Sequence, residues 1–317
     1  MIEVDRLTKN YGLARALKGI SFSVKRGEVV GFLGPNGAGK STTMKVLTGY
    51  LLPTSGRAQI AGHDVVDESL EVRRRIGYLP ESTPLYSEMR VDEYLRFCAE
   101  IRGVTAVRRV TAIDRAVQLC GLSRVTGKNI VELSKGYKQR VGLAQAIVHE
   151  PEVLILDEPT SGLDPNQIVE VRNLIERLGK EHTVILSTHY LQEVEKSCTR
   201  VIIVSQGDIV ADDTRDHLVA SLPAIAVRAR IIGPEDDVRS QLAELFVNRK
   251  IAIVIGENSV LNCTIEIGEG NAPAEAALAH LVVKNNWSLL ELSRERATLE
   301  DVFRRLTMQA SVEALHA

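Results

Sequence analysis

The sequence contains few cysteines and few aromatic residues. Its four cysteines, Cys98, Cys120, Cys198 and Cys263, are widely spread, and no two of them form a CxxC pair. This spacing predicts neither a zinc site nor a disulfide framework, and it suits a reducing cytoplasm. Aromatic residues make up only 4% of the chain and hydrophobic residues 44%, so the core must consist mainly of aliphatic side chains.

Long apolar runs and an excess of positive charge are also absent. No uninterrupted apolar run approaches the roughly 20 residues of a membrane-spanning helix. The N-terminal residues lack a basic flank followed by an apolar stretch, so we expect no signal peptide. The chain has 39 basic and 41 acidic residues, which disfavours a nucleic-acid-binding surface because such a surface needs a basic excess. We therefore expect no nucleic-acid partner and a location in the cytoplasm.

Short apolar runs alternate with longer amphipathic segments in the first two thirds of the chain. This pattern is typical of a parallel sheet covered by helices on both faces, an α/β fold. A helix-rich stretch, from about residue 84 to 150, predicts a helical subdomain inserted into that fold. We expect this unit to cover residues 1–220, with strands at Val29–Leu33, Val153–Leu156, Thr183–Ser187 and Val201–Val204.

The pattern changes after residue 220, and residues 221–317 predict a second, smaller domain. The order of expected elements is β-α-β-β-α-β, which favours a two-layer α+β sandwich of the ferredoxin-like kind. The expected strands are Ala224–Ile231, Ile251–Ile255, Leu261–Ile267 and Ser288–Ser293, and the expected helices are Glu235–Phe246 and Ala272–Lys284.

The first chemical motif is a glycine-rich loop between an expected strand and an expected helix. It matches G-x-x-x-x-G-K-[ST] in full, as Gly34-Pro35-Asn36-Gly37-Ala38-Gly39-Lys40-Ser41. Glycines let backbone N–H groups approach phosphate oxygens, and the following helix directs its positive end to the same place. We expect Lys40 to reach the β- and γ-phosphates, Ser41 to bind Mg²⁺ and Thr42 to contact the nucleotide. The alternative, a glycine-rich turn without a ligand, is disfavoured by the strand and helix around it.

The second motif is a pair of acids, Asp157 and Glu158, directly after an apolar strand. Such a strand places its carboxylates at the C-terminal edge of a parallel sheet, where ligands bind in open α/β folds. Asp157 is the expected Mg²⁺ partner. Glu158 points to the opposite side of the strand and is the expected base that deprotonates an attacking water. The alternative is a pair of solvated acids at a strand end.

Together with these motifs, further segments resemble the ATP-binding subunits of ABC transporters. The family's LSGGQ signature corresponds to Leu133-Ser134-Lys135-Gly136-Tyr137, and its D-loop to Ser161-Gly162-Leu163-Asp164. His189 is similar to the switch histidine, and Tyr11 lies where the family has an aromatic residue that stacks on adenine. Order and spacing agree from about Ile2 to Val210. The resemblance therefore implies a P-loop NTPase fold, ATP and Mg²⁺ as cofactors, and ATPase activity.

The resemblance also implies that two copies of the chain form the site. In this family the signature helix of one subunit, here with Ser134 and Gly136, caps the γ-phosphate held by the loop of the other. Asp164 and Ser161 are then expected at the subunit boundary. His189 is expected to hydrogen-bond the γ-phosphate or the attacking water. A lone histidine at a strand end is more often structural, but the full set of motifs favours the switch role.

Two positions depart from the family pattern. The glutamine that helps to bind Mg²⁺ corresponds to Glu81, whose carboxylate can still supply an oxygen to the ion or its water. In the signature, Lys135 and Tyr137 replace glycine and glutamine, and Lys135 adds positive charge near the expected phosphate. Neither departure removes the expected activity.

Within the family, the chain is most similar to the ATPases that pair with ABC-2-type permeases, such as gliding-motility and sodium- or drug-export ATPases. The C-terminal segment Thr298–Phe303 carries much of this resemblance, although it also fits an amphipathic helix capped by Thr298. The expected function is to power an exporter from the inner face of the cell membrane. The alternatives are an ABC ATPase acting on ribosomes or nucleic acid, disfavoured by the single cassette, and a non-hydrolysing ATP-binding module, disfavoured by Glu158 and His189.

Overall fold

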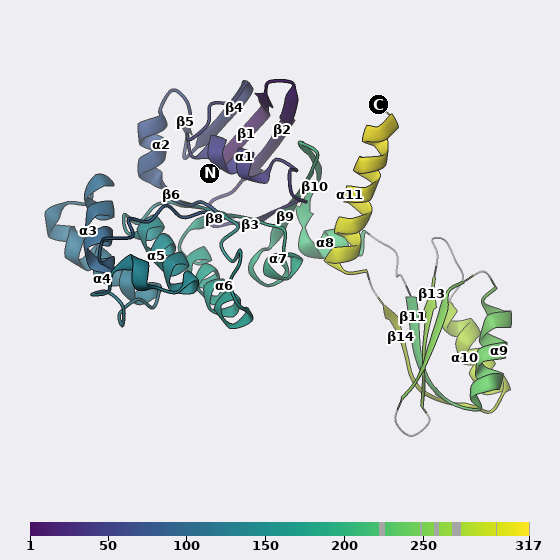
Figure 1. Ribbon diagram of the computed structural model, residues 1–317. Coiled ribbons are helices and arrows are strands. Elements are labelled where there is room, and N and C mark those ends of the chain that lie inside the picture. The colour runs from purple at the N-terminus through teal and green to yellow at the C-terminus, as the bar shows by residue number, and fades with distance from the viewer. Residues whose placement is uncertain (222–225, 248, 257–259, 268–273, 296, 317) are drawn as a thin grey trace. The chain divides into compact units, whose positions relative to one another are not determined.

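The computed structural model describes residues 1–221, 226–247, 249–256, 260–267, 274–295 and 297–316 (Figure 1). It divides into two compact units. The first contains Met1–Arg215 and the chain from Phe303 on, and the second contains Asp216–Val302. The division falls at the N-terminal end of helix α8 (Arg215–Ala220), whereas the domain boundary expected at residue 220 falls at its C-terminal end.

The first unit is built on a central sheet of six strands in the order β10-β9-β3-β8-β7-β6. All neighbours are parallel except β9 and β10. Every residue of β7 and β8 is buried, which agrees with their continuous apolar sequence. The strands are β3 Val29–Leu33, β6 Ile76–Leu79, β7 Val153–Asp157, β8 Thr183–Thr188, β9 Arg200–Ser205 and β10 Asp208–Thr214.

Helices cover both faces of this sheet, and Figure 1 shows α1 on one side and α5, α6 and α7 on the other. The expected α/β architecture is thereby confirmed. The inserted helical segment contains α3, α4, the short 3₁₀ helix η1 and α5. The helices are α1 Lys40–Leu47, α2 Ser69–Arg75, α3 Val91–Ile101, α4 Ala106–Leu119, η1 Ile130–Glu132, α5 Lys135–Ile147, α6 Pro165–Gly179 and α7 Leu191–Ser197.

A second, antiparallel sheet of the first unit was not expected from the sequence. It has the strand order β2-β1-β4-β5. Its apolar face shares one core with α1 and the central sheet, in which the rings of Phe22 and Phe32 lie 5.6 Å apart. The strands are β1 Ile2–Tyr11, β2 Ala14–Val24, β4 Ser55–Ile60 and β5 His63–Asp64.

The second unit has the expected β-α-β-β-α-β order and an antiparallel sheet, β12-β13-β11-β14. This strand order is that of a ferredoxin-like sandwich. The expected strand from Ala224 and the expected helix from Ala272 begin among residues outside the described ranges. The elements are β11 Ala226–Ile232, α9 Glu235–Leu245, β12 Ile251–Ile255, β13 Leu261–Glu266, α10 Ala274–Lys284 and β14 Ser288–Glu295.

The last element is helix α11, Leu299–His316. Its start is capped reciprocally: the Asp301 N–H donates to Oγ1 of Thr298 (3.2 Å), and the Thr298 N–H donates to Oδ2 of Asp301 (2.9 Å). Leu299 and Val302 are buried, as expected for an amphipathic helix. None of the helices within the described ranges combines the length and the apolar character of a membrane-spanning segment.

Candidate functional site

The glycine-rich loop connects β3 to α1 at the C-terminal edge of the central sheet. Gly37 and Gly39 have positive φ angles, 79° and 108°, in the region that favours glycine. A Cβ atom at Gly39 would also lie 2.7 Å from the carbonyl oxygen of Ala16, so a side chain there would collide with the backbone of β2. Because α1 begins at Lys40, its first N–H groups face the loop and form an anion-binding end.

Lys40 lies beneath this loop and is buried. Its Nζ atom donates hydrogen bonds to the carbonyl oxygens of Gly34 (2.8 Å) and Pro35 (3.3 Å). The same atom is 3.5 Å from Oε1 of Glu158, and each of the two side chains is only 6% exposed. A buried ammonium group needs such partners, since it has lost most of its hydration. The carbonyl groups of the loop therefore hold the Lys40 ammonium group in place.

Asp157 is the last residue of β7 and is almost fully buried. Its Oδ1 atom accepts hydrogen bonds from the Ser41 hydroxyl, at 3.1 Å, and from the Ser187 hydroxyl. Burial raises the pKa of Asp157. The two hydroxyl donors oppose this shift, while the negative charges of Glu158 and Glu81 add to it. A cation close to Asp157 would therefore stabilise the charged form of this carboxylate.

Glu158 follows in a left-handed conformation, with φ 49°. This conformation is uncommon for a residue with a side chain and is kept only where the surroundings fix it. Here the Glu158 N–H donates to the carbonyl oxygen of Ser187 at 3.0 Å. Oε2 of Glu158 lies 2.8 Å from Nδ1 of His189. The Tyr190 ring packs against the His189 ring, with centroids 4.0 Å apart.

One polar cleft, of about 480 Å³, brings most of these groups together. Glu81 reaches it from the loop after β6. Ala16 and Tyr190 also line it, although neither was among the expected site residues, and so does Ser161, which was expected at the subunit boundary. The expected residues that line the cleft are Asn36, Gly37, Gly39, Lys40, Ser41, Thr42, Glu81, Glu158 and His189.

Four other expected residues lie against the cleft without lining it. The carbonyl groups of Gly34 and Pro35 accept from Lys40, and Ala38 is buried within the loop. Asp157 contacts the cleft through Ser41. Ser187, which sequence reasoning missed, is paired with Asp157 in the register of β7 and β8. The end of the apolar run at Ser187 was the signal that could have identified it.

Tyr11, Ser134, Gly136 and Asp164 are not among the residues that line the cleft. Tyr11 is about half exposed. Ser134 caps α5 by accepting from the Tyr137 N–H (3.4 Å), and Asp164 caps α6 by accepting from the Gln167 N–H (2.9 Å). A Cβ atom at Gly136 would lie 2.6 Å from Cδ of Gln167. The starts of α5 and α6 are therefore packed together.

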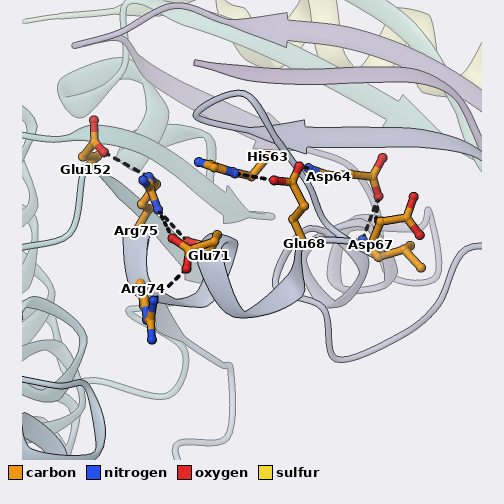
Figure 2. A network of polar contacts seen from close by, with 9 residues as sticks. His63, Asp64, Asp67, Glu68, Glu71, Arg74, Arg75 and Glu152 are labelled. Carbon is orange, nitrogen blue, oxygen red and sulfur yellow. Dashed lines mark hydrogen bonds and ion pairs between the residues drawn. The ribbon is translucent and has the colours of Figure 1, made fainter.

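A second polar network surrounds α2, away from the cleft (Figure 2). Glu71 accepts from Arg74 (2.7 Å) and Arg75 (2.9 Å), and Arg75 is 3.6 Å from Glu152, just before β7. Nδ1 of His63 lies 2.8 Å from Glu68, a contact that lowers the pKa of Glu68. Because these side chains pair with one another, the network ties α2 to the central sheet.

Comparison with known protein families identifies the cassette. A family model described as "ABC transporter" matches residues 17–161. A second model, described as "AAA domain, putative AbiEii toxin, Type IV TA system", overlaps it and matches residues 129–195. The two matches include the glycine-rich loop, β7 and β8, which are the segments that form the cleft.

Two relatives and one solved structure agree with the first model. The bacitracin transport ATP-binding protein BcrA of Bacillus licheniformis is 40% identical over 220 residues, covering 69% of this chain and 71% of BcrA. The linearmycin resistance ATP-binding protein LnrL of Bacillus subtilis (strain 168) is 32% identical over 313 residues, covering 97% and 98%. The dimeric structure of MJ0796, a bacterial ABC transporter cassette, is 25% identical, with a TM-score of 0.62 over 68% of this chain and 98% of that one. These similarities confirm the resemblance seen in the motifs, and the chain belongs to the ABC transporter family as an ATP-binding and ATP-hydrolysing subunit.

Proposed function

We propose that this ATPase works as a homodimer beneath a separate ABC-2-type permease, on the inner face of the cell membrane, and powers export. BcrA and LnrL are named for bacitracin transport and linearmycin resistance, which favours the export of a compound harmful to the cell. LnrL aligns over nearly the whole chain, including the second unit. Neither name refers to ribosomes or nucleic acid. The balanced charge of the chain agrees with this.

The observation that carries the proposal is the position of the Glu158 carboxylate between Lys40 (3.5 Å) and His189 (2.8 Å) at the cleft. When ATP binds, the Lys40 ammonium group can contact the β- and γ-phosphates in place of the loop carbonyl groups. The Glu158 carboxylate is then free to accept a proton. Glu158 then takes the proton of the attacking water, and His189 orients that water or the γ-phosphate. A base positioned in this way contributes typically about 10²- to 10⁴-fold in rate.

The donor groups of the site fit Mg²⁺. No cluster of three or more His, Cys, Asp or Glu side chains that could hold a metal ion by itself occurs in the part of the chain that the structure describes. The Ser41 hydroxyl lies 3.1 Å from Asp157, and Glu81 reaches the same cleft, so the available donors are all oxygen atoms. Mg²⁺ prefers such a set, since it keeps several waters and binds one or two carboxylates together with substrate phosphates. The ion would neutralise charge on the phosphates.

The residues outside the cleft support a two-chain site. Ser134 is exposed at the start of α5, where unpaired N–H groups favour an anion. Asp164 is exposed at the start of α6, and Gly136 packs against Gln167 of the same helix. We assign these residues to the nucleotide held by the partner copy. Tyr11, about half exposed on β1, is assigned to the adenine ring.

The Glu158→Gln variant tests the catalytic assignment. It keeps the shape of the side chain but removes its basicity. We expect ATP binding to persist, phosphate release to fall by about 10²-fold or more, and an ATP-bound dimer to accumulate on size exclusion with light scattering. Glu176→Gln, at an exposed position of α6, is the matched control and should retain turnover. Wild-type turnover by Glu158→Gln would remove Glu158 from the base role.

Purification from membranes tests the permease assignment. We expect the tagged chain, extracted in mild detergent, to carry a polytopic membrane protein in a fixed ratio, with two copies of the ATPase in each complex. Co-sedimentation with ribosomes and no membrane partner would contradict the proposal.

A further inference from the structure

Glu193 is a buried carboxylate that the proposed chemistry does not use. It lies in the first turn of α7 and is only 3% exposed. Its Oε1 atom accepts a hydrogen bond from the hydroxyl of Thr160, which is 2% exposed. Within the described part of the chain, its Oε2 atom has no hydrogen-bond partner. A carboxylate that loses its hydration in this way costs free energy unless its remaining contacts compensate.

The contact joins the two segments that carry the candidate catalytic groups. Thr160 belongs to the turn that leaves β7 after Glu158. In this turn the Ser161 N–H donates to the Glu158 carbonyl oxygen (3.1 Å), and the Leu163 N–H donates to that of Thr160 (3.2 Å). Glu193 is on the helix that follows His189. The Thr160–Glu193 hydrogen bond therefore links the backbone on either side of the Glu158–His189 pair.

The electrostatic surroundings show that Glu193 is held close to the site. Burial raises the pKa of Glu193, the hydroxyl groups of Thr160 and Thr188 oppose this, and the charge of Glu158 raises the pKa further. Arg172 of α6 acts in the opposite direction, yet the described structure has no ion pair within 4.0 Å between it and Glu193. The Nε atom of Arg172 is buried without a hydrogen-bond partner as well. Glu193 is thus held by hydroxyl groups, that of Thr160 foremost, and not by the nearby guanidinium.

We infer that Glu193 is a positioning residue for ATP hydrolysis: by holding Thr160, it fixes the turn that directs the Glu158 carboxylate toward His189. This inference rests on the base role proposed for Glu158. The φ angle of 49° at Glu158 is unfavourable for a residue with a side chain, so the turn relaxes unless its surroundings hold it. Glu193 is not placed in contact with the nucleotide. Glu193 acts by aligning the Glu158 carboxylate, because a displacement of a reacting group by about 1 Å can lower the rate about 100-fold.

Steady-state ATPase kinetics of the full chain test this role. Glu193→Ala removes the acceptor, and we expect kcat to fall by about 10- to 100-fold while KM for ATP stays within about threefold. Glu193→Gln keeps an acceptor oxygen for Thr160 and should restore kcat to within about threefold of wild type. Thr160→Val removes the donor and should match Glu193→Ala, and the double variant should be no slower than either single variant. Lys196→Ala, at an exposed position of α7, is the control.

Thermal unfolding of each variant separates positioning from a general loss of structure. The assays are run well below the lowest unfolding midpoint, so that every variant is folded. Wild-type kcat for Glu193→Ala, or a Glu193→Gln variant as slow as Glu193→Ala, overturns the inference. Glu158→Gln is measured in parallel. If it retains turnover, the proposed base role fails. If it is inactive while Glu193→Ala is unchanged, only the positioning role fails.

Discussion

Nδ1 of His189 lies 2.8 Å from Oε2 of Glu158, while the other carboxylate oxygen faces Lys40 at 3.5 Å. The Glu158 carboxylate is thus held from both sides, by a histidine that is partly exposed and by a buried lysine. The histidine borders the cleft, where a reacting water would lie. This arrangement supports the proposal that His189 orients the reacting water or the γ-phosphate.

Loss of the His189 side chain should therefore affect turnover more than binding. We expect His189→Ala to lower kcat by about 100-fold and to change the dissociation constant of ATP by less than about threefold. Phosphate release and equilibrium binding of a fluorescent ATP analogue measure the two quantities. His182→Ala is the matched control, because Nδ1 of His182 contacts the carbonyl oxygen of Pro151 outside the cleft. Equal losses in the two variants would contradict a specific role of His189.

Loss of the Lys40 side chain should instead affect ATP binding more than turnover. Its removal takes away the only lysine that lines the cleft among the described residues. We expect Lys40→Ala to weaken ATP binding by about 10- to 100-fold, which corresponds to the loss of a charge-assisted contact of about 1.5 to 3 kcal/mol. Equilibrium binding measures this change, and Lys45→Ala in the last turn of α1 is the control. Unchanged affinity of the Lys40→Ala variant would discredit the phosphate-binding loop.

Ser134 offers a test of the two-chain site, because its cap and its proposed contact with the partner's nucleotide can be separated. Ser134→Ala should lower the free energy of unfolding by about 0.5 to 2 kcal/mol, as the loss of a helix cap does. Ser134→Asp keeps a cap but places a negative charge toward the phosphate. We expect it to be as stable as wild type and to lack both ATP-dependent dimerisation and turnover. An active Ser134→Asp variant would argue against the contact.

The central sheet could be predicted because β7 and β8 are buried on both faces and therefore have continuous apolar sequences. The antiparallel sheet could not. In β1, the pairing with β2 shifts between Val4 and Leu7, and Arg6 has a positive φ angle of 45°. The irregularity moves Leu7 out of the alternation begun by Ile2 and Val4, so the period of two is lost after the first few residues.

The site shows the same contrast. Contiguous motifs such as the loop ending at Ser41 specify their own geometry and can be read directly. The contacts of Ser187 and Glu193 depend on strand register and on the packing of α7, which no local pattern reports. From the sequence alone, Glu193 would be predicted to be an ordinary solvent-exposed acid in a short helix. Its burial is a property of the tertiary structure.

His149 provides a prediction for the pH dependence of stability. Its Nε2 atom lies 2.9 Å from the carbonyl oxygen of Ile76, so this nitrogen carries the hydrogen, while Nδ1 is buried and has no hydrogen-bond partner among the described residues. A proton on Nδ1 would have no acceptor. Burial, aided by the charge of Arg102, accordingly lowers the pKa of His149 to about 4. The folded state thus prefers neutral His149, whereas the unfolded chain takes up a proton near pH 6.5.

Since the folded-state pKa is depressed, the stability linked to His149 is fully present above about pH 6.5 and is lost as the pH falls toward about 4. The loss amounts to about 2 to 3 kcal/mol. His149→Gln can still donate to the Ile76 carbonyl oxygen but does not titrate. The free energy of unfolding is measured in urea at about pH 7 and at about pH 4. Its decrease between these two pH values should be smaller in His149→Gln than in wild type by about that amount. The exposed His280→Gln variant should behave as wild type. An identical pH difference in wild type and His149→Gln would show that His149 is not the group whose protonation destabilises the fold.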